Sequence, residues 1–107
     1  MEDKVCCVTF HVENKTDKDV DCIYICGNHA KLGNWNPAKA LKVKKENGVF
    51  RIVRRFNEGE TLEYKVLCKP NWEGVDKGMW GEEIVNHTVV VESATKSEVT
   101  VYNWRQN

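Results

Sequence analysis

The sequence has neither a long apolar stretch nor an excess of charge of one sign. No run approaches the roughly eighteen consecutive apolar residues of a membrane-spanning helix. Sixteen basic residues balance sixteen acidic ones, so the formal net charge is zero. Domains that bind nucleic acid or an anionic membrane usually carry a basic excess. The composition therefore argues against nucleic acid and membrane as partners.

Catalytic and metal-binding motifs are also missing. The sequence contains no Gly-x-Ser-x-Gly, no His-Glu-x-x-His, no phosphate-binding glycine loop and no dinucleotide fingerprint. It has no Cys-x-x-Cys, and His11, His29 and His87 stand far apart along the chain. We therefore expect no metal, no cofactor and no catalysis by the chain itself.

The cysteines favour free thiols over disulfides. Their number is odd, five, and the neighbours Cys6 and Cys7 would point to opposite faces of a strand. Free thiols imply a reducing compartment. Residues 1–4 also lack the basic start and apolar stretch of a signal peptide. These observations predict a cytoplasmic protein.

The dominant periodicity is that of strands. A chain of 107 residues predicts a single domain, residues 1–107. Six runs are β-rich or alternate between apolar and polar residues, and a short seventh is expected as well. They lie at residues 5–12, 20–26, 49–56, 61–69, 87–92 and 98–104, with the short one near 41–43. Turn residues between the runs predict an all-β fold, an antiparallel β-sandwich of about seven strands.

The run at residues 61–69 alternates most cleanly. Leu62, Tyr64 and Val66 share one face, and Lys65 lies on the opposite face. This pattern predicts that the Lys65 ammonium group reaches solvent.

Tryptophan is more abundant than a small sandwich requires. A core of this size needs about one, and the sequence has Trp35, Trp72, Trp80 and Trp104. Trp35 lies in a turn-rich segment, and Trp72 and Trp80 bracket the glycine-punctuated residues 73–79. Because loops run over the surface, we expect these three indoles to be partly exposed.

Exposed indoles suit a sugar ligand. The C–H face of a pyranose packs on a flat indole, while amide and ammonium groups hydrogen-bond the hydroxyls around its rim. Two indoles set at an angle would fit successive glucose units of an α-1,4 chain. The alternative is that Trp35 and Trp80 close the ends of the sandwich, and composition alone leaves both interpretations open.

Four segments in order resemble one known family. They are residues 23–27, residues 31–40, residues 62–66, and Trp80 followed by Asn86. Over nearly the whole chain the sequence resembles the starch-binding domains, family 20 of the carbohydrate-binding modules. The Leu-Gly-Asn-Trp-Asn-Pro stretch and the Glu-Tyr-Lys strand are specific when found together at this spacing.

The resemblance implies an immunoglobulin-like sandwich that binds α-1,4-glucan without turnover. Such a module targets an attached or partner enzyme to starch, glycogen or maltooligosaccharides. The residues that match the family's first site are Trp35 and Trp80 for stacking, and Lys65 and Asn86 for hydrogen bonds.

The match departs from the family pattern after Lys65. One residue is inserted between Trp80 and Asn86, and His87 replaces an arginine. The longer connection also contains Trp72, which is an alternative to Trp80 as the second stacking residue. We prefer Trp80 because Asn86 follows it at nearly the expected distance.

The family's second site is expected to be weak or absent. Tyr24 matches its tyrosine, but Phe50 stands where tryptophan is usual, and a phenyl ring has a smaller stacking area and no N–H group. The alternative is that both are ordinary strand residues.

Two other functions remain open. The altered sequence after Trp80 suggests a protein-interaction module whose sugar site has decayed, and a small hydrolase would require an acidic pair facing the tryptophans. A glycan on the sequon Asn86-His87-Thr88 would cover the proposed site, so the glucan and cytoplasmic interpretations support each other. We expect the cluster of Arg51, Arg54 and Arg55 to solvate an outer sheet face.

Overall fold

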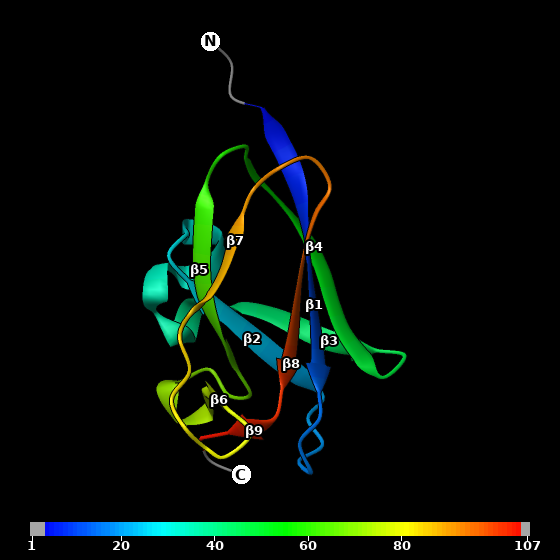
Figure 1. Ribbon diagram of the computed structural model, residues 1–107, viewed down its shortest axis with the longest axis vertical. Helices are drawn as coiled ribbons and strands as arrows, with labels where there is room; N and C mark the ends of the chain where they lie inside the picture. Colours follow the sequence, from blue (N-terminus) through cyan, green and yellow to red (C-terminus); the bar gives the residue numbers. More distant parts are fainter. Residues whose placement is uncertain (1–3, 106–107) are drawn as a thin grey trace.

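Strands dominate the computed structural model, which describes residues 4–105 (Figure 1). The strands are β1 (Val5–Asn14), β2 (Cys22–Gly27), β3 (Leu41–Glu46), β4 (Val49–Asn57), β5 (Thr61–Leu67), β6 (Asp76–Lys77), β7 (His87–Val90), β8 (Thr95–Val101) and β9 (Asn103–Trp104). Short 3-10 turns lie in the connections: η1 (Ala30–Trp35), η2 (Pro37–Lys39) and η3 (Trp72–Gly74). No helix within residues 4–105 is long and apolar enough to cross a membrane.

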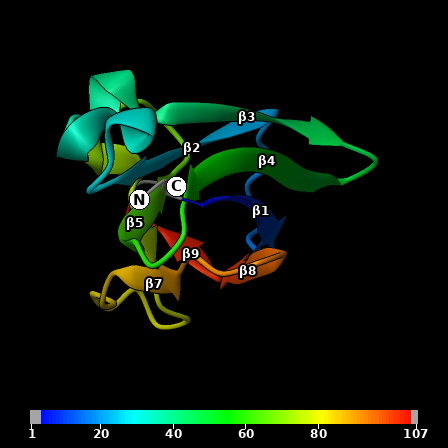
Figure 2. The ribbon, with the colours of Figure 1, turned by 90° about the horizontal axis from the view of Figure 1, so that it is seen from above.

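The strands form two packed layers, as Figure 2 shows. Their order is β7-β5-β2-β3-β4-β1-β8, and β6 pairs separately with β9. β3 joins the layers because its first part pairs with β2, while Lys45 and Glu46 pair with Phe50 and Val49 of β4. The predicted all-β sandwich is confirmed.

One pairing differs from the antiparallel prediction. β8 runs parallel to β1, from Val8 opposite Thr95 to Asn14 opposite Val101. The successive antiparallel pairings give β7 the direction opposite to that of β1. The chain reverses after β7 as it passes to the other layer, so β8 runs in the direction of β1. Alternation in a sequence reports which face a residue occupies and carries no information on strand direction.

The boundaries near the end of the chain also differ. β8 begins at Thr95, inside the predicted turn at residues 93–97, and the predicted run at residues 98–104 is divided between β8 and β9. The turn is short because Ala94 adopts a left-handed φ of 58° and the Thr95 hydroxyl accepts a hydrogen bond from the Glu92 N–H at 2.7 Å.

The core lies between the two layers. Alternate residues of β1 are buried, as its sequence predicts: Cys6, Val8, Phe10 and Val12. Phe10 makes edge-to-face contacts with Phe56 and with Tyr64, whose ring centroids lie 6.1 and 5.3 Å away. Burial of such apolar area provides the main driving force for folding.

Trp104 is the core tryptophan. Its side chain is 2% exposed, and its indole N–H donates to the Thr16 hydroxyl at 3.1 Å. The other three tryptophans lie outside the strands, as their loop positions predict.

Tyr64 gives the core a measurable pH dependence. Burial raises the pKa of its phenol to about 12, and the hydroxyl lies 2.5 Å from that of Ser97. The phenol ionises less readily in the folded protein than in the unfolded chain, where its pKa is near 10. The stability that Tyr64 contributes is therefore fully present below pH 10 and is lost as the pH rises towards 12. We expect the free energy of unfolding to decline over this range, with up to about 2–3 kcal/mol coming from Tyr64.

Urea unfolding of the wild type and of Tyr64→Phe, at about pH 9 and about pH 11, measures this contribution. The variant lacks the Ser97 hydrogen bond at both pH values. The informative quantity is therefore how much more the free energy of unfolding falls between the two pH values in the wild type than in the variant. Equal declines in the two proteins would contradict the assignment.

Candidate functional site

The loop that carries Trp35 has an unusual backbone. Gly33, Asn34 and Trp35 have left-handed φ values of 81°, 48° and 62°. Two hydrogen bonds close the loop, from the Asn34 N–H to the His29 carbonyl at 3.0 Å and from the Asn36 N–H to the Gly33 carbonyl at 2.9 Å. This sharp reversal directs Trp35 back towards the sheet.

The structure explains the residue type at several positions of the Leu-Gly-Asn-Trp-Asn-Pro stretch. Leu32 is fully buried and anchors the loop in the main core. A Cβ atom on Gly33 would lie 2.7 Å from the carbonyl oxygen of Lys39, so only glycine fits there. The Asn36 side chain accepts from the Ala38 N–H at 3.1 Å and caps η2, which begins with Pro37.

A second loop carries Trp72. It begins after β5 and is closed by the Cys68 N–H, which donates to the Gly74 carbonyl at 2.8 Å. The Asn71 side chain accepts from the Glu73 N–H at 3.0 Å and caps η3. A Cβ atom on Gly74 would lie 2.6 Å from the Lys69 backbone nitrogen, so the close turn requires glycine.

The two loops bring Trp35 and Trp72 together. Their ring centroids lie 6.4 Å apart, with 34° between the ring planes. Trp35 is half-buried against a small cluster formed by Cys26, Leu67 and Val75, and Trp72 is 38% exposed. We call this pair the Trp35/Trp72 platform.

Trp80 lies in a different loop and is 86% exposed. No ring contact involves it within residues 4–105. The structure therefore pairs Trp35 with Trp72, the alternative that the sequence left open. A contact between Trp80 and sugar stays a prediction.

Lys65 lies on the face that carries the platform. It stands opposite Cys26 on β2, the residue against which Trp35 packs. The half-buried Lys65 ammonium group donates to the Ile84 carbonyl, so the segment before β7 lies beside it. Asn86 is the last residue of this segment and directly precedes His87, which pairs with Tyr64.

Tyr24 and Phe50 do not form a site. Phe50 is 1% exposed inside the main core, whereas Tyr24 lies on the outer face of β2 and packs against the cluster of Cys26, Leu67 and Val75. A ligand cannot reach Phe50 without opening the sandwich. The two residues are strand residues on opposite faces, which is the alternative that the sequence analysis gave beside a weak or absent second site.

A hydrogen bond between the buried Asp76 and His87, next to Asn86, was missed from the sequence. The carboxylate of Asp76 is 1% exposed, and its Oδ2 lies 2.6 Å from Nε2 of His87. Its Oδ1 accepts from the Val66 N–H at 3.2 Å. The pair ties β5, β6 and β7 together directly behind Asn86, and no sequence motif signals it.

Burial makes two of the thiols, Cys26 and Cys68, less reactive than an ordinary cysteine, because it raises their pKa. All five cysteines, which lie within the described residues 4–105, are unpaired. Across the same residues, no three His, Cys, Asp or Glu side chains come together as metal ligands.

Comparison with known proteins identifies relatives across the chain. A family model described as a starch binding domain matches residues 5–101. An amylopullulanase from Thermoanaerobacter thermohydrosulfuricus is 33% identical over 92% of this chain and 7% of its own length. A cyclomaltodextrin glucanotransferase from Thermoanaerobacterium thermosulfurigenes is 30% identical over 94% of this chain and 14% of its own. The chain therefore spans only a small part of these curated relatives.

Solved structures share the fold. The family 20 CBM of a maltotetraose-forming amylase from Pseudomonas saccharophila STB07 superposes with a TM-score of 0.64 at 18% identity, over 88% of this chain and 98% of that one. A glucoamylase from Hypocrea jecorina gives a TM-score of 0.67 at 24% identity, over 96% of this chain and 17% of its own.

The chain offers a matched pair of glycines to test the Trp35 loop. Gly33 and Gly48 have nearly the same φ, 81° and 82°, but a Cβ atom on Gly48 would meet nothing within 4 Å. Gly48→Ala should cost about 1–2 kcal/mol for the left-handed conformation alone. Gly33→Ala should cost more, because its Cβ also clashes with Lys39, and should change the near-UV circular dichroism of the Trp35/Trp72 platform. Equal losses of stability in urea unfolding would contradict the loop geometry.

Proposed function

The chain belongs to the starch-binding domain family, and we propose that it binds α-1,4-glucan on the Trp35/Trp72 platform. The observation that carries this proposal is the tilted pair of indoles, 6.4 Å apart, on a face that also bears Lys65, with Asn86 in the segment beside it. In this arrangement each indole stacks on the C–H face of one glucose unit. Because the two ring planes are tilted by 34°, they suit successive glucose units of a curved chain better than they suit a flat one.

Lys65 and Asn86 supply the polar contacts. The ammonium group has three donors, and one of them is used by the Ile84 carbonyl. The others can donate to glucose hydroxyls. Asn86 is half-buried, and its amide can both donate and accept, as sugar hydroxyls do.

The site is held in shape before a ligand arrives. Trp35 rests on an apolar cluster, Trp72 lies on a closed loop, and Asn86 is flanked by the Asp76–His87 pair. Such preorganisation reduces the entropy that binding must overcome. Because the face is open, we expect modest affinity for short oligosaccharides and tighter binding to a polymer that presents many sites.

We further propose the setting in which this binding operates. The chain matches small parts of amylolytic enzymes, which favours a role in holding an attached or partner catalytic domain against polysaccharide. Five free thiols favour a cytoplasmic location, in which glycogen is the polysaccharide present in many cells. A glycan on Asn86 would obstruct the site, which is consistent with the same compartment.

Titration with β-cyclodextrin, a cyclic α-1,4-glucan, followed by tryptophan fluorescence tests the platform. The affinity of Trp35→Ala and of Trp72→Ala should fall at least about tenfold, equivalent to about 1.4 kcal/mol, because each loses one stacking surface. Trp72→Phe keeps a flat ring and should lose less than Trp72→Ala.

Arg55→Ala, on an exposed position of β4, is the control and should bind as the wild type does. Binding that is lost in Trp80→Ala but kept in Trp72→Ala would move the stacking partner of Trp35 to Trp80. A folded wild type that does not respond to the ligand would instead support the protein-interaction alternative.

A further inference from the structure

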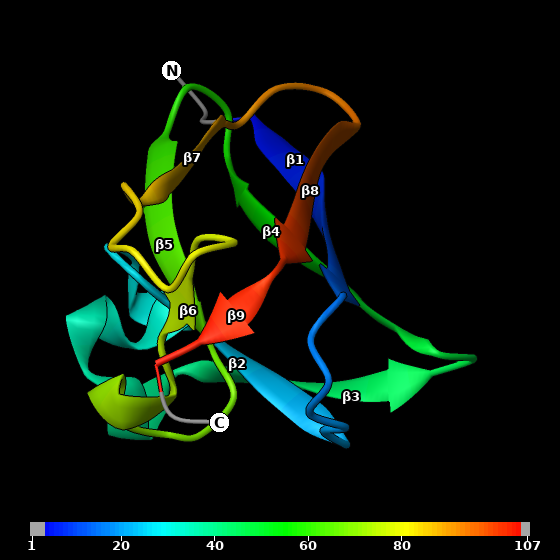
Figure 3. The same cartoon turned by 60° about the horizontal axis from the view of Figure 1, so that its bottom comes forward.

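β4 and β1 present an open sheet face away from the Trp35/Trp72 platform. Alternate residues of β4 point outward, and each lies opposite an outward residue of β1. Six side chains form this surface, which we call the Arg51/Arg55 face: Arg51, Val53 and Arg55 of β4, opposite His11, Thr9 and Cys7 of β1. Both arginines are exposed, and Val53 is 38% exposed. In Figure 3, β4, β1 and β8 lie on one side of the molecule, and the loops after β2 and β5 lie on the other.

The two arginines of this face have no partner among the described residues. In residues 4–105, every ion pair is made by lysine or histidine, and none by arginine. In the same part of the chain, no hydrogen bond uses the guanidinium group of Arg51 or Arg55, whereas that of Arg54 donates to the Val53 carbonyl at 2.9 Å. Each guanidinium group of the face therefore keeps its donors, a planar fork that matches a carboxylate.

The acidic residues beside the face are already paired with lysines. Glu98 of β8 lies opposite His11, but the Lys96 ammonium group hydrogen-bonds its carboxylate at 2.9 Å and holds the pKa of Glu98 below its ordinary value. Glu13, two residues beyond His11 on β1, is paired with Lys15 at 2.8 Å. The charge that remains unpaired on the Arg51/Arg55 face is therefore positive.

Arg54 belongs to the same sequence cluster but not to this face. It lies opposite Val8, whose side chain is buried, so it occupies the other face of β4. The cluster expected to solvate one outer face is thus divided, with two of its arginines on that face and one off it. The two that remain, Arg51 and Arg55, are about 13 Å apart along the strand, with Val53 between them.

This spacing of charges fits a polypeptide better than a nucleic acid. Proteins that bind duplex DNA commonly contact about 6–10 phosphates, and this chain has no net positive charge to supply so many contacts. In an extended peptide, acidic residues at positions i and i+4 are also about 13 Å apart, and an apolar residue at i+2 lies between them on the same side. Such a segment places one carboxylate on each guanidinium group and its apolar side chain on Val53.

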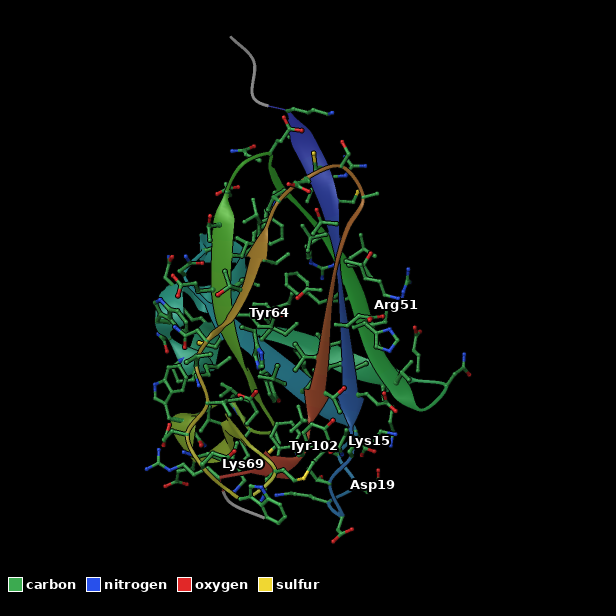
Figure 4. The ribbon with its side chains drawn as sticks, viewed as in Figure 1. Lys15, Asp19, Arg51, Tyr64, Lys69 and Tyr102 are labelled. Atoms are coloured by element: carbon green, nitrogen blue, oxygen red, sulfur yellow. The ribbon has the colours of Figure 1, made fainter. Side chains whose placement is uncertain are left out.

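We propose that the Arg51/Arg55 face docks an extended acidic segment of a protein partner. Figure 4 shows Arg51 on the side of the molecule opposite the loops that carry the platform. A partner docked there leaves the platform open, so the domain can hold a protein and a polysaccharide at the same time. The protein contact is independent of the glucan site and does not require that site to have decayed.

A nine-residue peptide of sequence Glu-Thr-Val-Thr-Glu-Thr-Val-Thr-Glu tests the face. Added to the ¹⁵N-labelled domain, it should shift the backbone amide signals of β4 and β1 saturably, and the same peptide with Gln in place of Glu should not. Because the contacts lie at the surface, we expect a dissociation constant of about 1 mM at low salt, and weaker binding as salt screens the charges. No shift with the Glu peptide, or equal shifts with both peptides, would overturn the inference.

Charge reversal on β4 offers a matched pair of variants. Arg55→Glu should weaken peptide binding at least about tenfold, because its carboxylate repels that of the peptide. Arg54→Glu changes the net charge by the same amount on an exposed residue of the other face, and should bind the peptide as the wild type does. Equal losses in the two variants would indicate a response to net charge alone and would overturn the docking face.

The double variant Arg51→Glu/Arg55→Glu separates this inference from the proposed function. It should lose peptide binding and bind β-cyclodextrin as the wild type does, and saturating β-cyclodextrin should leave the peptide affinity of the wild type unchanged. Competition between the two ligands would overturn the separate face, as would a short DNA duplex that shifts the same amides more strongly than the peptide does. Failure of the glucan proposal would appear instead in Trp35→Ala and Trp72→Ala, and it would leave the peptide titration unaffected.

Discussion

The apolar contact on the outer face of β2 and β5 supports the whole binding face. Cys26 and Leu67 are fully buried there, and Val75 returns to pair beside Leu67. These strands therefore bury both faces, with Ile25 and Val66 directed into the main core. The loops that carry Trp35 and Trp72 cover the outer cluster. Because the same burial holds the loops and stabilises the two strands, site geometry and fold stability are coupled.

A polar contact completes the support on the other side. The Asp76 carboxylate joins the Val66 N–H to His87, and Lys65 reaches the Ile84 carbonyl. Removing one partner of a buried pair leaves an uncompensated polar group, so these contacts admit few alternative registers for β7. They fix the connection that carries Asn86. The apolar cluster thus sets the stacking surface, and the polar contacts set the position of the hydrogen-bonding groups.

The periodicity of the sequence predicts which face of a strand a residue occupies, because this depends on its neighbours in the sequence. It does not predict features that depend on contacts between segments far apart in the chain. The alternation predicts Lys65 on the outer face, and Lys65 lies there, opposite Cys26. Phe50 lies on the inward face of β4 together with Phe56. The direction of β8 and the pairing of Trp35 with Trp72 had no such local signal. Each depends on a contact between segments far apart in the chain: β8 with β1 in the first case, and the loop after β2 with the loop after β5 in the second.

The connection between β5 and β7 contains Trp72 and Trp80. Trp72 precedes Val75, which packs under the platform, and Trp80 follows Lys77, which pairs with β9. The intervening residues 75–77 are buried, so they separate two exposed indoles rather than letting them collapse together. The burial of Val75, Asp76 and Lys77 therefore fixes both loops to the sandwich, and with them the separation of Trp72, which lies against Trp35, from the exposed Trp80.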